Sequence, residues 1–228
     1  DVAKLGYGLS GTIVELGGER DKNYRLTTTE GAEIVLKFIN SEETSSETDL
    51  QIQVLDWLDQ QAHGMQLPKV IKTLDDRSMY ECSIDGDGIV VRAYTYVSGQ
   101  SLLGLRGSQA LCESFGAIAA QMVNALAGFD HSALERVLLW DVMHVARLKS
   151  LLEKTDLDSL LKAQFSEYLE YFEKNIYPQL MTLPMQVIHG DLSKSNLVVM
   201  PEDQSMICGV LDFGDLAKAP RIVELGIA

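Results

Sequence analysis

Cysteine and basic residues are scarce in this chain of 228 residues. Its three cysteines, Cys82, Cys112 and Cys208, lie far apart in sequence, which argues against a disulfide framework and a cysteine-rich metal site. Lysine and arginine total 19 against 33 aspartates and glutamates, giving a net charge of −14. This charge argues against nucleic acid or an anionic membrane surface as a partner, and it is compatible with a cationic small molecule.

Long apolar runs are also missing. None approaches the roughly 20 residues of a membrane span, and the N-terminus lacks the basic-then-apolar pattern of a signal segment. We therefore expect a cytoplasmic protein with reduced thiols and no membrane partner. The chain opens on Asp1 rather than methionine and stops at Ala228, so we expect it to be a piece of a longer polypeptide.

The most informative segment lies near the C-terminus, at residues 189–196, with the sequence HGDLSKSN, and is followed by the DFG tripeptide 212–214. Asp191 and Asn196 have the spacing of a kinase catalytic loop, and Asp212 opens the tripeptide that holds a metal ion in kinases. A carboxylate such as Asp191 can accept the proton of a hydroxyl that attacks a γ-phosphorus. Asn196 and Asp212 supply the hard oxygen ligands that Mg²⁺ prefers. The two motifs predict Mg²⁺-dependent phosphoryl transfer.

The order of the predicted elements indicates two lobes. Strand-forming runs cover residues 12–16, 22–28, 34–39, 79–84 and 89–97, and short strands return at 186–188, 197–200 and 207–211. Helical periodicity follows the polar stretch 41–46 and dominates from 108 to about 179, where we expect Phe165, Leu169 and Phe172 to be core. We predict an α+β, bilobal, protein-kinase-like fold. Residues 1–98 would form the nucleotide-binding lobe, and residues 99–228 an incomplete helical lobe with the catalytic and metal loops.

Candidate phosphate-binding residues lie in the first lobe. Lys37 follows two predicted strands and precedes a helix, as does the kinase lysine that reaches the α- and β-phosphates. Gly17 and Gly18 fall in the turn between the first two strands, where backbone N–H groups could approach phosphate; a hairpin turn that needs glycine for its dihedrals explains them nearly as well. The GYGLSG run at residues 6–11 matches G-x-G-x-x-G, but it precedes a strand and lies too far from Lys37, so we reject it.

These motifs together resemble the aminoglycoside phosphotransferase and choline kinase superfamily. The glycine of HGD at residues 189–191 and the DFGD at 212–215 mark that branch. The segments YGLSGT at 7–12 and GERDKNY at 18–24 are similar to the hydroxylysine kinase-like subgroup, whose bacterial members are often fused to a class III aminotransferase. The resemblance runs nearly end to end. It implies that the full-length protein could carry such an aminotransferase domain.

The resemblance also implies an adenine site. The Thr95 carbonyl and the Val97 N–H would hydrogen-bond adenine, and Val35 and Val198 would lie on either side of the ring, although both valines could equally be ordinary strand core. His189 would brace the catalytic loop.

Two departures from the family pattern stand out. The helix glutamate that pairs with the strand lysine falls on Gln51, so we expect either Glu47, one turn earlier, or Gln51 to steady Lys37. Superfamily members also continue past residue 225 into helices that wall the acceptor site.

The leading hypothesis is a kinase that moves the γ-phosphate of ATP or GTP to a hydroxyl of a small, amine-bearing molecule of the hydroxylysine, aminoglycoside, choline or homoserine type. Lys37, Asp191, Asn196 and Asp212 would then converge on one cleft. The alternative is a non-catalytic nucleotide-binding regulatory module of a larger fusion protein. Magnesium dependence of nucleotide binding would separate the two hypotheses.

Overall fold

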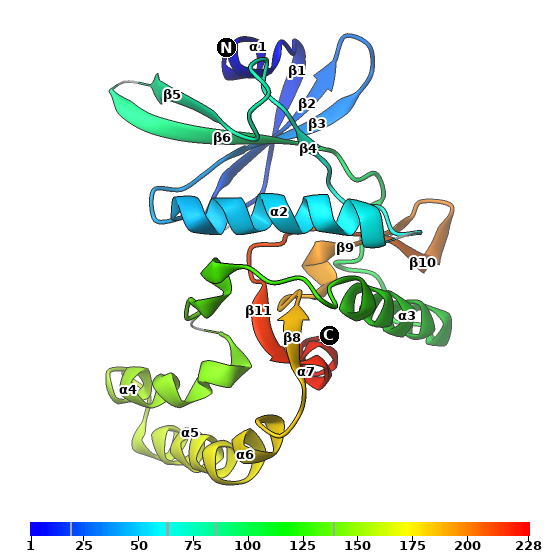
Figure 1. Cartoon of the computed structure of the whole chain (residues 1–228). Helices are drawn as coiled ribbons and strands as arrows, with labels where there is room; N and C mark the ends of the chain where they lie inside the picture. The colour runs from blue at the N-terminus through cyan, green and yellow to red at the C-terminus, as the bar shows by residue number, and fades with distance from the viewer. Residues whose placement is uncertain (19, 63, 85, 139) are drawn as a thin grey trace. The chain divides into compact units, whose positions relative to one another are not determined.

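The computed structural model describes residues 1–18, 20–62, 64–84, 86–138 and 140–228 (Figure 1). Its α-helices are α1 (Val2–Tyr7), α2 (Ser45–Gln61), α3 (Gln109–Ala125), α4 (Leu148–Glu153), α5 (Ser159–Tyr171), α6 (Tyr177–Leu180) and α7 (Arg221–Ile227). Its strands are β1 (Gly11–Leu16), β2 (Lys22–Thr28), β3 (Glu33–Phe38), β4 (Val70–Ile71), β5 (Tyr80–Ile84), β6 (Asp87–Thr95), β7 (Gln100–Ser101), β8 (Met185–Ile188), β9 (Leu197–Met200), β10 (Asp203–Val210) and β11 (Ala217–Pro220). Short 3-10 or π segments are η1 (Ser132–Glu135), η2 (Val142–Arg147), η3 (Phe172–Ile176) and η4 (Lys194–Asn196).

The chain divides into two compact units, each made of two stretches of sequence. The first contains Asp1–Ser114 and Lys194–Leu211, and the second contains Phe115–Ser193 and Asp212–Ala228. The predicted domain boundary at residue 98 stays a prediction. The structure adds that β9 and β10 group with the N-terminal stretch.

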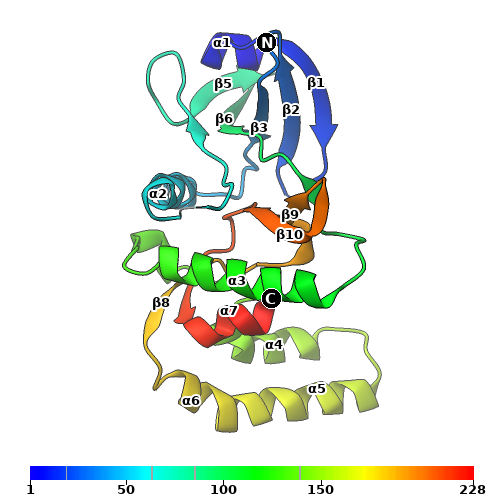
Figure 2. The same cartoon turned by 90° about the vertical axis from the view of Figure 1, so that its right-hand side faces the viewer.

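The first unit is built on a six-stranded antiparallel sheet in the order β1-β2-β3-β6-β4, with β5 also paired to β6 (Figures 1 and 2). The five strands predicted in this region are confirmed to within about two residues at each end, because their alternating apolar and β-branched residues are interrupted by glycine turns. In the register, Lys37 of β3 lies opposite Asn23 of β2 and Arg92 of β6.

The two faces of this sheet differ in chemistry. One face packs on α1 through an apolar cluster that includes Ala3, Tyr7, Leu26, Leu36 and Val91. The Tyr7 hydroxyl donates a 2.8 Å hydrogen bond to the Val91 carbonyl, which fixes α1 to the sheet. Because side chains alternate along a strand, Lys37 lies on the other face, together with its cross-strand neighbour Arg92.

Helix α2 begins with a capping box. The Thr44 Oγ1 accepts from the Glu47 N–H at 3.3 Å, and Glu47 Oε2 accepts from the Thr44 N–H at 2.8 Å. Leu50, Val54 and Leu58 form its fully buried stripe, as the helical spacing predicts.

The second unit contains most of the helices. Helices α4 and α5 lie side by side, and β8 pairs antiparallel with β11 (Figures 1 and 2). The prediction that Phe165 is core was wrong: it is 49% exposed, while Leu169, four residues later, is buried. In the described part of the chain, no helix is both long enough and apolar enough to cross a membrane.

Candidate active site

Lys37 forms an ion pair that the sequence analysis did not anticipate. Its Nζ lies 3.0 Å from Oδ2 of Asp21, and the two side chains are 15% and 8% exposed. Asp21 directly precedes β2, at the end of the turn that carries Gly17 and Gly18. Burial alone would raise the pKa of the Asp21 carboxyl, but the Lys37 charge and hydrogen bonds from Asn40 outweigh it and hold this pKa below its usual value. Asp21 is therefore charged at neutral pH.

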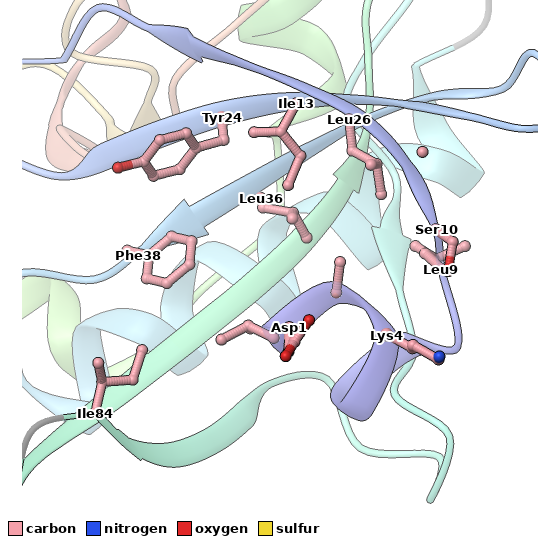
Figure 3. Close-up of a pocket in the computed structure, with 13 residues that line it drawn as sticks. Asp1, Lys4, Leu9, Ser10, Ile13, Tyr24, Leu26, Leu36, Phe38 and Ile84 are labelled. Carbon is pink, nitrogen blue, oxygen red and sulfur yellow. The ribbon is translucent and has the colours of Figure 1, made fainter.

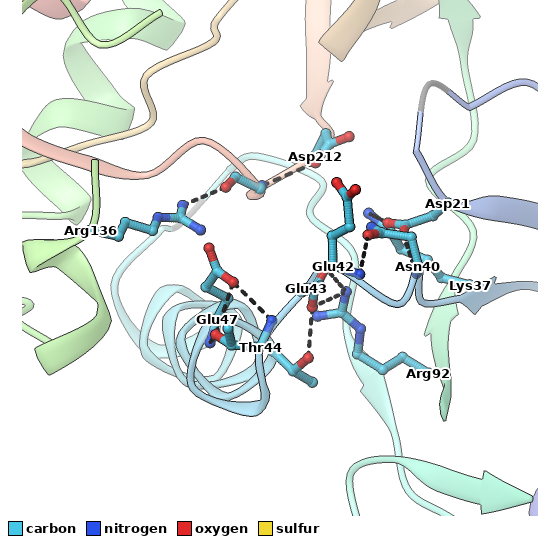
Figure 4. A network of polar contacts seen from close by, with 12 residues as sticks. Asp21, Lys37, Asn40, Glu42, Glu43, Thr44, Glu47, Arg92, Arg136 and Asp212 are labelled. Carbon is cyan, nitrogen blue, oxygen red and sulfur yellow. Dashed lines mark hydrogen bonds and ion pairs between the residues drawn. The ribbon is translucent and has the colours of Figure 1, made fainter. Parts of the chain in front are cut away.

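A polar network extends from this ion pair along the connection between β3 and α2 (Figure 4). Asp21 Oδ1 accepts from both the backbone N–H and the side-chain amide of Asn40, at 2.9 and 2.8 Å. Beyond Asn40, the fully buried Arg92 pairs with Glu43 at 3.1 Å, and Thr48 of α2 donates to the same Glu43 carboxylate at 2.7 Å. Charged side chains thus connect the glycine turn, the strand lysine and the first turn of α2.

The two residues predicted to steady Lys37 both lie on α2. Glu47 Oε2 accepts from the backbone N–H and the hydroxyl of Thr44, each at 2.8 Å, which is its role in the capping box. Gln51 is buried. The pairing of Lys37 with Glu47 or Gln51 stays a prediction, whereas Asp21 is one carboxylate that lies beside the ammonium.

The two glycines of the turn differ. A Cβ on Gly18 would lie 2.4 Å from the Asp21 carbonyl oxygen, so close backbone approach requires glycine there. A Cβ on Gly17 would meet nothing within 4 Å. Neither glycine has a positive φ, so the turn does not require them for their dihedrals. Gly17 thus leaves open space beside the chain, as a phosphate-binding turn needs.

The predicted adenine-contacting residues all belong to the first unit. Val35 of β3 lies opposite Tyr94 of β6, and β6 ends at Thr95, whose hydroxyl accepts from the Lys69 N–H at 2.9 Å. Val97 and Val198 are buried in one cluster with Cys208. Their packing fits both an adenine pocket and a plain core, so the nucleotide role of these residues stays a prediction.

In the second unit, the catalytic loop is held by its own motif residues. The His189 ring is fully buried and packs edge-on against Phe213, with 4.9 Å between centroids. Its Nδ1 accepts from the Asp191 N–H at 3.3 Å. Gly190 has a φ of 80°, and a Cβ there would lie 2.2 Å from the Asp215 carbonyl oxygen, so only glycine fits. These contacts join the loop of Asp191 to the loop of Asp212.

Glu224 of α7 holds the same loop through hydrogen bonds to its backbone. Its side chain is fully buried, and its Oε2 accepts from the backbone N–H groups of His189 and Gly190 at 2.5 and 3.4 Å. Burial raises the pKa of Glu224 to about 7; the two N–H donors oppose this shift and the charge of Asp191 adds to it. Glu224 could not be identified from the sequence, because no motif or apolar periodicity around it predicts a buried carboxylate.

The loop that carries Asp212 is held by a hydrogen bond within the loop and by two hydrogen bonds from Arg136. Asp212 is exposed and has a φ of 54°, a left-handed conformation that aspartate tolerates better than most residues. Its Oδ1 accepts from the Gly214 N–H at 3.0 Å. Arg136 donates to the carbonyl oxygens of Gly214 and Leu216 at 2.5 and 3.3 Å (Figure 4). The Asp212 side chain therefore projects from a loop whose backbone is held on both sides.

Asn196 ends the 3-10 segment η4, and its carbonyl accepts from the Leu211 N–H at 2.8 Å, directly before Asp212. One amide oxygen and one carboxylate are donors suited to Mg²⁺, which usually takes one or two protein ligands and completes its shell with phosphate and water. Within the described ranges, no group of three or more His, Cys, Asp or Glu residues is placed to hold a metal. A metal site that is completed by phosphate oxygens and water does not need such a group of protein ligands.

The first unit also has a pocket of about 400 Å³, on the α1 face of the sheet (Figure 3). Leu36 and Phe38 line it, and both flank Lys37 in β3, so the lysine side chain projects from the opposite face. Lys37 and this apolar pocket therefore lie on opposite faces of the sheet.

The family model described as the phosphotransferase enzyme family matches residues 12–228. The chain belongs to this family. The match confirms the resemblance drawn from the HGD and DFGD motifs, and it includes all four predicted phosphoryl-transfer residues, Lys37, Asp191, Asn196 and Asp212.

Curated relatives of this phosphotransferase family member include hydroxylysine kinases of vertebrates. The Danio rerio protein is 28% identical over 238 residues, which cover 100% of this chain and 67% of the relative. The Mus musculus protein is 27% identical, covering 94% of this chain and 62% of the relative. The chain thus spans roughly two thirds of the length of these relatives.

Solved structures with the same fold are small-molecule kinases by name. An amicoumacin kinase in complex with AMP-PNP, Ca²⁺ and Ami has a TM-score of 0.70 at 16% identity, over 99% of this chain and 65% of that one. A microcompartment-associated aminopropanol kinase has a TM-score of 0.67 at 16% identity, over 99% and 71%. A macrolide 2'-phosphotransferase from Brachybacterium faecium has a TM-score of 0.64 at 16% identity, over 98% and 73%. These similarities confirm the predicted α+β, kinase-like fold.

Proposed function

We propose that this phosphotransferase transfers the γ-phosphate of ATP or GTP to a hydroxyl of a small, amine-bearing molecule. The observation that carries the proposal is the second unit's arrangement, in which Asp191 and Asp212 project from two loops that pack on each other through His189 and Phe213. A held carboxylate beside a loop that would bind metal fits the arrangement that phosphoryl transfer requires.

Asp191 would orient the acceptor hydroxyl and take its proton. A carboxylate is a weak base, so its contribution would come chiefly from positioning and electrostatics, as expected for a loose phosphoryl-transfer transition state. Glu224 and His189 keep this loop in place through its backbone, so they would influence the reaction without touching substrate.

In the first unit, Lys37 would bind the α- and β-phosphates, and backbone N–H groups at Gly17 and Gly18 would approach them. Thr95 and Val97 would bind adenine, with Val35 and Val198 beside the ring. Asn196 and Asp212 would hold Mg²⁺, which neutralises charge on the β- and γ-phosphates when bound. The convergence of Lys37, Asp191, Asn196 and Asp212 on one cleft stays a prediction.

The amine-bearing acceptor is supported by three observations. Curated relatives are named hydroxylysine kinases, and a structural neighbour is named an aminopropanol kinase. The net charge of −14 also favours a cationic acceptor over an anionic one. We further propose a cytoplasmic location and, in the full-length protein, fusion to an aminotransferase domain; the sequence of the whole gene tests the fusion.

A second candidate function, a non-catalytic nucleotide-binding regulatory module, is favoured by the glutamine at position 51, where the family pattern has the glutamate that pairs with the strand lysine. Its distinguishing outcome is nucleotide binding that does not depend on metal.

The first test compares wild type with Asp191→Ala in the full-length protein. Phosphoryl transfer to hydroxylysine, choline, aminopropanol and an aminoglycoside would be measured with ATP and with GTP. We expect the variant to lose transfer to the preferred acceptor while its nucleotide affinity stays within a few-fold, because Asp191 faces the acceptor. Near-normal turnover of the variant would refute the assignment.

The second test uses calorimetric titration of nucleotide with Mg²⁺ and with chelator. We expect Asp212→Ala to abolish most of the difference between the two affinities, because the metal bridges protein and phosphates. If that difference survives in the variant, Asp212 is not a metal ligand. If wild type shows no difference, the regulatory module is the better reading.

A further inference from the structure

We propose that Asp21 positions Lys37 for phosphate binding and so supplies the carboxylate that the family pattern places on the helix after β3. This inference rests on the proposed function, because it assigns a role to Lys37 in binding nucleotide.

The first argument is geometric. Asp21 divides its two carboxylate oxygens between two partners: Oδ2 lies 3.0 Å from Lys37 Nζ, and Oδ1 accepts twice from Asn40. Asn40 follows β3 by two residues, and Lys37 is the fifth residue of that strand, so the carboxylate is held against the strand end from both sides. With its own position fixed, it can fix that of the ammonium.

The second argument concerns the helix. The α2 position that usually carries the glutamate is Gln51, which has no charge, and Glu47 Oε2 accepts two hydrogen bonds from Thr44 at the helix N-terminus. An ammonium that is 15% exposed is stabilised by a carboxylate nearby, and Asp21 provides one at 3.0 Å.

The ion pair between Lys37 and Asp21 is compatible with nucleotide binding. An ammonium carries three N–H donors, and the ion pair with Asp21 uses one, so the pair does not preclude a phosphate contact. Asp21 also ends the turn of Gly17 and Gly18, and the Gly18 backbone lies against the Asp21 carbonyl. The same residue therefore holds the lysine and the turn that would bind phosphates.

The opposite role is also testable, because Asp21 could compete with phosphate for Lys37. Positioning predicts that removing the charge weakens nucleotide binding, and competition predicts that it strengthens binding. We favour positioning because the two hydrogen bonds from Asn40 hold the Asp21 carboxylate in place. A carboxylate held in this way restricts where the Lys37 ammonium can lie.

The experiment measures the dissociation constants of ADP and adenosine for wild type, Asp21→Asn, Lys37→Met and the double variant, in the full chain with Mg²⁺. Asparagine keeps the oxygen that accepts from Asn40 and replaces the charged oxygen beside Lys37 by an uncharged amide NH2, which cannot accept from the ammonium. Glu33→Gln is the matched control, since Glu33 pairs with Arg25 at 3.4 Å on the same sheet and does not contact Lys37.

We expect Asp21→Asn to weaken ADP binding by about tenfold or more, the loss typical of a charge-assisted contact, and to leave adenosine binding unchanged. In the Lys37→Met background it should have no further effect on ADP. The Glu33 control should match wild type.

Three results would overturn the inference: ADP affinity within twofold of wild type or higher, equal losses for ADP and adenosine, or full additivity with Lys37→Met. A wild-type protein that binds neither ligand would instead remove the proposed function, and the inference with it.

Discussion

Replacing Glu224 by glutamine should change how the stability of the protein depends on pH. Glu224 is fully buried, and its pKa is raised from 4.5 to about 7. The folded state therefore binds a proton that the unfolded state releases between these two values, so folding stability contributed by this group is present below pH 4.5 and is lost as pH rises through 7. At 1.36 kcal/mol per pKa unit, the loss is on the order of 3 kcal/mol.

Glutamine keeps an oxygen for the His189 and Gly190 N–H groups but carries no charge. The free energy of unfolding of Glu224→Gln minus that of wild type should therefore rise by about 3 kcal/mol between pH 4.5 and 7.5. All other acidic groups are common to both proteins and cancel in this difference.

Urea unfolding followed by circular dichroism at half-unit pH steps measures this difference, with Glu33→Gln as the control for a glutamate that is not fully buried. Hydrogen exchange of the His189 and Gly190 amides locates the effect, because these two groups donate to the carboxylate. A difference that stays constant over the whole pH range would refute the reasoning.

Two further substitutions test the packing around the site. Gly190→Ala should reduce phosphoryl transfer by at least about tenfold and lower the thermal midpoint, because the new Cβ would lie 2.2 Å from the Asp215 carbonyl oxygen at a φ of 80°; unchanged kinetics would contradict this. Arg92→Ala should destabilise the protein by about 3–5 kcal/mol in urea unfolding, because it removes the guanidinium that pairs with the Glu43 carboxylate, whose side chain is only 10% exposed. A loss below about 1 kcal/mol would show that Glu43 finds water or another partner.

The elements around the site could be predicted from sequence because their signals are local. Strand β2 was predicted at its observed bounds, since turn residues frame its β-rich run. The helical spacing of Leu50, Val54, Leu55 and Leu58 indicates a helix after residues 41–46, and all four are buried in α2; HGD and DFG predicted the loops. What local patterns cannot give is which element covers which face. Phe165 and Leu169 follow the same helical periodicity, yet Leu169 is buried and Phe165 is 49% exposed.

The positioning residues were missed for a related reason. Asp21 and Lys37 are 16 positions apart and meet only because β2 and β3 pair in one register, with Lys22 opposite Phe38. Glu224 and His189 are 35 positions apart, and each is ordinary in its own segment. Ion pairs and buried acids of this kind depend on long-range register, which propensity and spacing do not encode.

The interrupted first unit has a consequence for biosynthesis. Strand β7 pairs with β9, and Gln66 exchanges backbone hydrogen bonds with Cys208 and Val210. These early segments can therefore form their native pairings only after Lys194–Leu211 has been synthesised. At about 5–20 residues per second, the ribosome needs several seconds to add the intervening Phe115–Ser193. During that time the edge of β7 and the apolar surface of Val97 are open to chaperones or to neighbouring nascent chains. The first unit can therefore complete its fold only after β10, its last strand in sequence, has been synthesised.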